Sequence, residues 1–139
     1  MPAPVALPFV PPAIPWHTAQ PLRLPLDLGP GLDPSCCGAA LTRLCAEPDV
    51  QAVVAFGSRG RGEARSDSDL DLAVIVGTPQ LTPQQKLDCW RRCRQALGRL
   101  GVGVDLVVAG RLDADRLSQS RWHVLGDVAR QGRVLYVAH

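Results

Sequence analysis

The sequence has 139 residues, 46% of them hydrophobic and 20% charged, which allows one domain with a buried core and excludes a fully disordered chain. A formal net charge of +2 is too small for a dedicated nucleic-acid-binding surface, and no apolar run reaches the roughly 18 residues of a membrane span. Lys86, the only lysine, lies outside any G-x-x-x-x-G-K-[ST] loop, which excludes phosphate-loop NTPases. The first residues do not predict a signal peptide, and the odd number of five cysteines favours reduced thiols in a cytoplasm.

The beginning of the chain differs in composition from the rest, because residues 1–34 contain ten of the thirteen prolines. Proline at this density prevents helices and central strands, so these residues are predicted to form an extended, polyproline-like arm in front of a domain at 35–139. Phe9, Trp16 and several leucines make the arm more apolar than an ordinary linker. Two alternatives stay open: a passive extension, or an arm that docks on its own domain or on a partner.

Beyond the arm, helical and strand patterns alternate along the chain. The predicted elements are a helix from Asp33 or Ser35 to about 46, a strand at 50–56, a loop with one helical turn at 57–68, a strand at 69–76, a helix from 83 to about 100, a strand at 102–108, a mostly helical region at 113–131 and an edge strand at 134–137. This alternation predicts an α/β (α+β) fold in which a small mixed sheet is flanked by helices.

The helix expected at 83–100 has the clearest start signal, since Thr82 and Gln85 are spaced as in a capping box. Leu87, Trp90 and Leu97 are expected on its inner face. Its arginines are expected to form a solvated basic face, with an acidic partner or RNA as the alternative.

Two carboxylates lie close together at the start of the second strand. Asp69 and Asp71 are two residues apart, so both side chains leave the same face of the sheet, whereas Leu70 and Leu72 point the opposite way into a core. Like charges at this spacing are costly unless a cation neutralises them, and no basic residue lies at two-residue spacing. Hard oxygen ligands without clustered His or Cys indicate Mg²⁺ or Mn²⁺.

The turn after the first strand has features of a phosphate-binding loop. Gly57 allows a phosphate to approach the backbone, and Ser58 offers a hydroxyl and a backbone N–H. Arg59, Arg61 and Arg65 follow closely, and contact with phosphate oxygens or plain exposure to solvent are equally expected for them.

A third acidic residue, Asp105, lies in the middle of the third predicted strand. An aspartate is disfavoured there by strand propensity and by burial unless something binds it. Three strand carboxylates that converge near a Gly-Ser turn predict a two-metal site for phosphoryl or nucleotidyl transfer.

The remaining cysteines and histidines point to no further site. Cys89 and Cys93 lie on one helix face and Cys36 and Cys37 are adjacent, which is an unusual arrangement for zinc and is typical of small core residues. His17, His123 and His139 are isolated in the sequence and predict neither a metal site nor a catalytic triad.

These residues carry a family resemblance. Gly57-Ser58, ten intervening residues and then Asp69-Leu70-Asp71 resemble the signature of the polymerase-beta-like nucleotidyltransferases. Within that superfamily, FGSRGRGEARSDSDLDLAV is similar to the wording of the minimal nucleotidyltransferases, with Gly60 where alanine is usual. The likeness continues through Asp105 and covers about residues 36 to 137, which leaves the arm outside.

The resemblance implies roles for the quoted residues. Asp69 and Asp71 would bind two Mg²⁺ ions, and Asp105 would bind one of them and act as, or assist, the general base. Gly57 and Ser58, with Arg59 beside them, would hold the phosphates of ATP. Because the likeness stops before the arm, deletion of the arm is expected to leave metal and nucleotide binding intact.

The resemblance also implies a biological role. Minimal nucleotidyltransferases are commonly antitoxins whose partner is a HEPN-domain toxin, and they are understood to transfer AMP from ATP onto a tyrosine of that toxin. Two functions are therefore compatible with the sequence. One is an active protein adenylyltransferase, and the other is an antitoxin that neutralises its partner by contact with weak or no catalysis. The presence of all three aspartates favours the enzyme.

Overall fold

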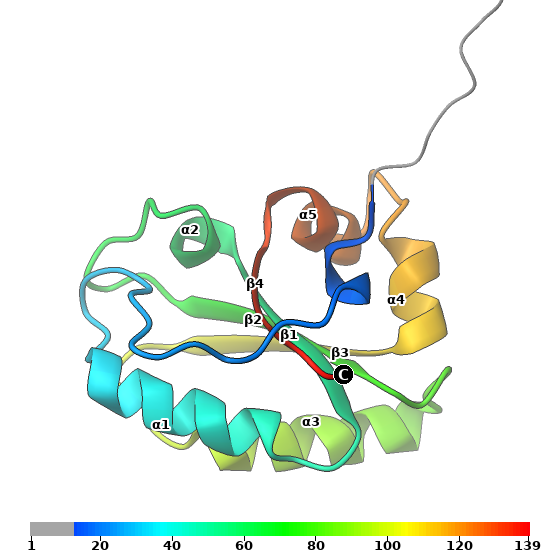
Figure 1. The fold of residues 1–139 in the computed structure, drawn as a ribbon, viewed down its shortest axis with the longest axis horizontal. Helices are drawn as coiled ribbons and strands as arrows, with labels where there is room; N and C mark the ends of the chain where they lie inside the picture. Colours follow the sequence, from blue (N-terminus) through cyan, green and yellow to red (C-terminus); the bar gives the residue numbers. More distant parts are fainter. Residues whose placement is uncertain (1–12) are drawn as a thin grey trace, which may run out of the picture.

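The computed structural model describes residues 13–139 as a mixed four-stranded sheet with helices on both faces (Figure 1). The strands are β1 (Val50–Phe56), β2 (Leu70–Val76), β3 (Val104–Gly110) and β4 (Arg133–Val137), in the order β3-β2-β1-β4. The helices are η1 (Pro15–His17), α1 (Pro34–Cys45), α2 (Gly57–Gly60), α3 (Pro83–Leu97), α4 (Arg111–Leu117) and α5 (Val124–Gln131). Strand β1 is antiparallel to β2 and β4, whereas β2 and β3 are parallel. The predicted α/β (α+β) class is confirmed.

Each face of the sheet is covered by its own layer of helices. Helices α1 and α3 lie on one face, and α2, α4 and α5 lie on the other (Figure 1). Strands β1 and β2 are apolar over nearly their whole length because both of their faces are buried. In β2 the alternation sends Leu70 and Leu72 into the α1–α3 layer, as expected, and Ala73 and Ile75 into the other.

Local signals account for the ends of the long helices. The Asp33 side chain accepts a hydrogen bond from the Cys36 N–H and caps α1. Thr82 and Gln85 form the predicted capping box at the start of α3. The region predicted as mostly helical at 113–131 is divided into α4 and α5, because a turn interrupts it and the His123 ring caps α5 by accepting the Leu125 N–H.

The predicted inner face of α3 is correct for Leu97 and wrong for two other residues. Leu87 is 41% exposed and Trp90 is 38% exposed, whereas the buried face consists of Cys89, Cys93 and Leu97 at four-residue spacing. Helix α3 packs against both α1 and the edge strand β3, and the side of the helix turned toward them is the one that carries the cysteines. Trp90 lies at this edge and donates its indole N–H to the Leu106 carbonyl oxygen at 3.1 Å.

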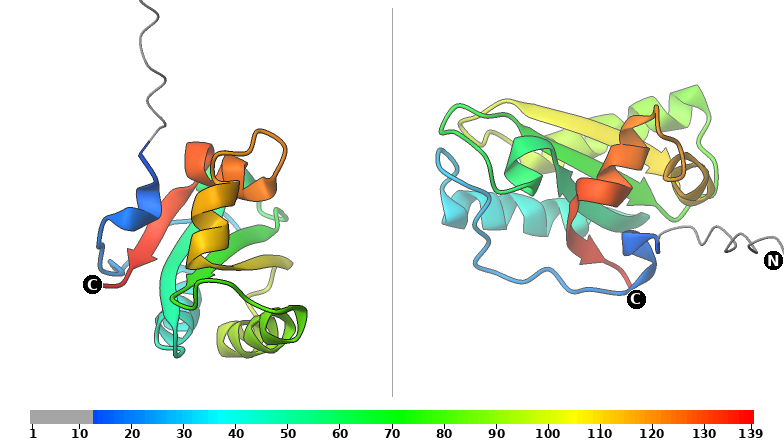
Figure 2. Two further views of the ribbon diagram at one scale, coloured as in Figure 1. Left: turned by 90° about the vertical axis from the view of Figure 1, so that its right-hand side faces the viewer. Right: turned by 90° about the horizontal axis from the view of Figure 1, so that it is seen from above.

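The described part of the arm, residues 13–34, packs on the domain. Trp16 and three leucines of this segment, Leu26, Leu28 and Leu32, are buried. The backbone of Gln20 exchanges two hydrogen bonds with Val137, so the arm continues the sheet beside β4 (Figure 2). The described part of the arm therefore docks on its own domain, which is one of the alternatives that the sequence left open. Phe9 and the rest of residues 1–12 lie outside the described residues.

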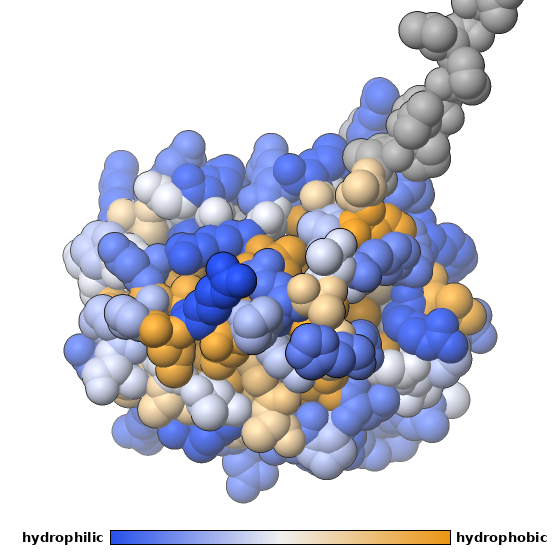
Figure 3. All heavy atoms as spheres, viewed as in Figure 1, coloured by the Kyte–Doolittle hydropathy of each residue, from blue (hydrophilic) through white to orange (hydrophobic). Residues whose placement is uncertain are grey.

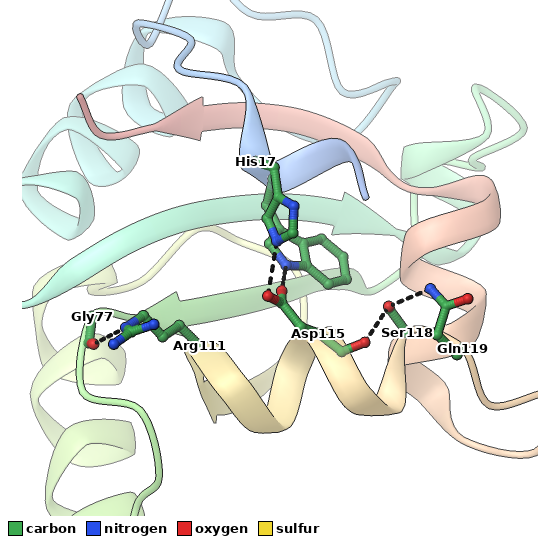
Figure 4. Close-up of polar contacts among 7 residues, drawn as sticks. His17, Gly77, Arg111, Asp115, Ser118 and Gln119 are labelled. Carbon is green, nitrogen blue, oxygen red and sulfur yellow. Dashed lines mark hydrogen bonds and ion pairs between the residues drawn. The ribbon is translucent and has the colours of Figure 1, made fainter. Parts of the chain in front are cut away.

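A second contact fixes the start of the described arm to α4. The Trp16 indole N–H donates to Asp115 Oδ1 at 2.8 Å, and the His17 ring lies 2.8 Å from Asp115 Oδ2 (Figure 4). His17 is therefore paired with a carboxylate, which its isolated position in the sequence did not suggest. The face of the molecule on which the arm lies shows apolar side chains surrounded by polar ones (Figure 3). None of the helices in residues 13–139 combines the length and the apolar character needed to cross a membrane.

Candidate active site

Three carboxylates meet where β2 and β3 begin. Asp71 of β2 is paired in register with Phe56 at the end of β1 on one side and with Asp105 of β3 on the other. Paired residues on neighbouring strands leave the same face of the sheet, about 5 Å apart, so Asp71 and Asp105 lie side by side. Asp69 directly precedes β2 and lies opposite Gly103. The structure therefore brings together the three aspartates that the sequence singled out.

Two glycines leave the space that these carboxylates occupy. Gly57 follows Phe56 with φ at +65°, and a Cβ atom at this position would collide with the Asp71 carboxylate. A Cβ atom at Gly103 would collide with the Asp69 carboxylate in the same way. The sequence pattern predicted a role at the phosphates for Gly57 but did not single out Gly103, whose only signal is a glycine in an otherwise apolar strand two residues before Asp105.

The carboxylates repel one another electrostatically. Burial raises the pKa of Asp71 to about 6, and a hydrogen bond with the Asp105 side chain and the charges of Asp105 and Asp69 act in the same direction. The Arg61 guanidinium opposes this shift only in part. At neutral pH the folded site thus holds negative charges that lack sufficient compensation from the protein, which is the condition that favours a bound cation.

The donor chemistry of this cluster fits a hard divalent cation. Carboxylate oxygens are the ligands that Mg²⁺ and Mn²⁺ prefer. Within residues 13–139, no group of three or more His, Cys, Asp or Glu side chains is already arranged to hold a metal ion. The three aspartates are thus neighbours whose side chains would have to rotate toward a common ion.

The turn beside the carboxylates is the short helix α2, which follows β1 directly. The Ser58 carbonyl accepts the Glu63 N–H and the Gly57 carbonyl accepts the Arg61 N–H, so the backbone of the turn is closed on itself. Ser58 is half-buried. The structure places Gly57 and Ser58 next to Asp71, at the end of the strand that pairs with β2.

The three arginines of this region have different surroundings. Arg59 is 1% exposed, and its guanidinium donates hydrogen bonds only to backbone carbonyl oxygens, so the structure does not bring it to the carboxylates. Contact of Arg59 with a phosphate would require those bonds to break. Arg61 lies near enough to lower the pKa of Asp71, and its Nε donates to Glu63 at 3.1 Å. Arg65 is exposed.

The five cysteines are free, and three of them, Cys37, Cys89 and Cys93, are buried. The three buried cysteines are therefore the small core residues that the sequence predicted, while Cys36 is exposed. Burial raises the pKa of Cys45 to about 11, which keeps this thiol protonated at neutral pH.

Comparison with protein families identifies the domain. The family described as "Polymerase beta, Nucleotidyltransferase" matches residues 41–138, which is most of the described chain. The chain belongs to this family. The predicted superfamily is thus confirmed, and the Gly57–Ser58 turn and the three aspartates all lie within the matched region of this nucleotidyltransferase. Membership supports transferase activity in general.

Several solved structures resemble this nucleotidyltransferase. A toxin–antitoxin structure with AMP-PNP is 24% identical, with 72% of this chain and 73% of that chain covered and a TM-score of 0.47. A Sulfolobus solfataricus protein assigned as a nucleotidyltransferase is 19% identical, with coverage of 78% and 93% and a TM-score of 0.46. The MntA-HepT toxin–antitoxin is 22% identical, with coverage of 70% and 68% and a TM-score of 0.41. At these identities and scores the likeness says nothing about activity or partners. No curated protein matches the chain.

Proposed function

We propose that this nucleotidyltransferase moves AMP from ATP onto a tyrosine of a HEPN-domain toxin and thereby acts as its antitoxin. The observation that carries the proposal is the row formed by Asp71 and Asp105 on paired strands, with Asp69 beside them and the Gly57-Ser58 turn at the end of the adjoining strand. The choice of a protein acceptor is supported by the similarity of FGSRGRGEARSDSDLDLAV to the minimal nucleotidyltransferases.

Each residue of the site has a role in this reaction. Gly57 and Ser58 hold the β- and γ-phosphates, because the glycine admits them to the backbone and the serine offers its hydroxyl. Asp69 and Asp71 would hold two Mg²⁺ ions, and Asp105 would hold one of them. When bound, these ions neutralise the charge of the phosphates and of the departing pyrophosphate.

The transfer itself is a single displacement at phosphorus. The acceptor hydroxyl oxygen forms a bond to the α-phosphorus of ATP, the bond between this phosphorus and the bridging oxygen to the β-phosphate breaks, and pyrophosphate leaves. Asp105 accepts the proton of the hydroxyl, which it can do because β3 places it beside Asp71 at the open end of the strands. Asp71 must lose the proton that it shares with Asp105 before a cation binds, so cation binding should strengthen as the pH rises through about 6.

The proposal is tested with ATP labelled in its α-phosphate. The full chain and Mg²⁺ are incubated with a HEPN-domain toxin, and this acceptor is analysed for labelled AMP on tyrosine. Asp105→Asn should lower labelling at least a hundredfold, while Asp67→Asn, a change of the same kind in the exposed loop before β2, should leave it unchanged.

The other outcomes assign a different function. A complex that forms without any transfer of label would support the antitoxin that acts by contact. Transfer of label with full activity in Asp105→Asn would make this carboxylate a structural residue. Absence of both transfer and complex formation would overturn the proposal.

A further inference from the structure

The guanidinium of Arg59 is buried and is surrounded by backbone oxygens. Its Nη1 donates to the carbonyls of Leu28 and Pro30 in the arm, at 2.9 Å each. Its Nε and Nη2 donate to the Ser68 carbonyl at 3.0 and 2.8 Å, and Nη2 also donates to the Arg65 carbonyl at 3.3 Å. The five bonds use the whole hydrogen-bonding capacity of the side chain.

These bonds connect the arm to both segments that carry the site. Arg59 directly follows Ser58 in α2, and the carbonyl that it binds twice belongs to Ser68, the residue immediately before Asp69. Of the other three acceptors, the Leu28 and Pro30 carbonyls are on the arm, and the Arg65 carbonyl is in the loop before Asp69. A single side chain thus fixes the distance between the Gly57-Ser58 turn and the first carboxylate, and the arm supplies its other anchor.

Glycines in the arm allow it to approach the loop at 61–68 closely. Gly29 and Gly31 have φ values of +95° and +88°, which other residues adopt only with strain. A Cβ atom at Gly31 would collide with the backbone of Ser66, and one at Gly29 would lie 3.0 Å from the Ala64 Cβ. The arm and the loop are therefore fitted to each other around the guanidinium.

Hydrogen bonds of the guanidinium hold the backbone of the arm beside α2, in addition to the burial of the Leu28 side chain in the core. A cavity of about 340 Å³ lies between the arm and α2, lined by Arg59 together with Leu28, Arg61 and Arg133. Because all of its acceptors are neutral carbonyls, the guanidinium has no carboxylate partner to exchange for them. Removal of the guanidinium would leave buried carbonyls without donors. A lysine has a single ammonium group, which cannot reach the acceptors of the arm and those of the loop at 61–68 in the same way.

We infer that Arg59 is a positioning residue for the nucleotide site and that the arm around Leu28 and Pro30 is its anchor, so the arm is a working part of the site. The part that concerns nucleotide affinity rests on the proposed function, whereas the anchoring does not. This inference replaces the expectation that deletion of the arm leaves nucleotide binding intact, because deletion would remove two of the five hydrogen bonds of Arg59.

Two variants and a matched control test the inference. Arg59→Lys keeps the charge and removes the guanidinium, and Gly31→Ala separates the arm from the loop without touching the turn or the carboxylates. Gly62→Ala is the control. Gly62 lies in the loop at 61–68 and has a φ of +73°, similar to that of Gly31, but the space around its Cβ position is open. Each full-length protein is examined by hydrogen–deuterium exchange without nucleotide and by calorimetric titration with a non-hydrolysable ATP analogue and Mg²⁺.

Arg59→Lys and Gly31→Ala should both speed exchange at least tenfold in the peptide that covers residues 24–33, and both should weaken binding of the analogue at least tenfold. Gly62→Ala should leave exchange in that peptide unchanged and the affinity within about twofold, because its effect is confined to the loop. A merely structural role of Arg59 would change exchange but not the affinity of the folded protein.

Three results would overturn the inference. In the first, Arg59→Lys binds the analogue more weakly without a change of exchange at 24–33, and Gly31→Ala binds it normally. This result would mean that Arg59 contacts phosphate directly. Faster exchange with unchanged affinity would separate the arm from the site. Unchanged exchange in both variants would refute the anchor itself. If the wild-type chain failed to bind the analogue, the proposed function would fail, and exchange would still decide whether Arg59 holds the arm.

Discussion

Replacement of Asp105 by asparagine should stabilise the metal-free protein at neutral pH. The pKa of Asp71 is raised to about 6 from an ordinary value of 3.8, and Asp105 contributes both a hydrogen bond and a negative charge to this shift. A group with a raised pKa in the folded state contributes stability below its ordinary pKa, and this stability is lost as the pH rises through the folded value. Between pH 4 and pH 6, wild-type stability should therefore fall, and Asp105→Asn should fall less.

The size of the effect follows from the shift. A displacement of two pKa units corresponds to roughly 3 kcal/mol at most. Burial, the first cause, remains in the variant, and Asp71 is only half-buried, so water screens the charges. We therefore expect a gain in the free energy of unfolding of about 1 kcal/mol at pH 7.5, which corresponds to about 3 °C in melting temperature for a chain of this length.

Urea denaturation in the presence of a chelator, at pH 7.5 and at pH 4, measures this gain. The gain should be present at pH 7.5 and absent at pH 4, where Asp71 is protonated in both proteins. Asp67→Asn removes an exposed carboxylate from the nearby loop and should give no gain at either pH. Equal or lower stability of Asp105→Asn at pH 7.5, or a gain that persists at pH 4, would refute the assignment of repulsion between these carboxylates.

Three further substitutions test other parts of the structure. Gly57→Ala should abolish binding of the ATP analogue in calorimetry, because its Cβ collides with the Asp71 carboxylate, while Gly62→Ala, with open space, should retain binding. Leu28→Ala should lower the free energy of unfolding in urea by roughly 2–4 kcal/mol, since this arm residue is buried in the core; a change below about 0.5 kcal/mol would mean that the arm is not docked in solution. Thr82→Ala should cost about 1 kcal/mol in the same assay through loss of the α3 cap, and an unchanged midpoint would contradict the capping box.

The strands and the carboxylate row were predictable because their signals are local. Alternation along β2 places Leu70 and Leu72 in the core and Asp71 on the other face, whatever the rest of the chain does. The spacing between the Gly57-Ser58 turn and Asp69 then restricts the site to one end of the sheet. Gly103 was missed because its importance depends on the register between β2 and β3, which the sequence does not contain.

The surroundings of Arg59 and of the arm depend on tertiary structure. An arginine next to Ser58 is compatible with a phosphate ligand and with a buried anchor, and only the position of the Leu28 and Pro30 carbonyls distinguishes the two. Leu22, Leu24, Leu26 and Leu28 alternate along the arm, but the prolines among them argue against a central strand. The alternation also does not separate the buried Leu26 and Leu28 from the exposed Leu24, so their burial could not be inferred from the pattern. The error at Leu87 and Trp90 has a related cause, because size and hydrophobicity favoured them over the cysteines that face α1 and β3.

The contacts at the two outer strands also limit how molecules of this protein can associate. An unpaired strand edge is a template on which another chain can add a strand and begin to aggregate. At β3 the Trp90 indole occupies the Leu106 carbonyl that such a strand would need. At β4 the Gln20 backbone occupies both hydrogen-bonding groups of Val137. Each margin of the sheet thus has one point at which the same molecule occupies the hydrogen-bonding groups of the edge strand, and release of the arm would free those of Val137 for strand exchange between copies.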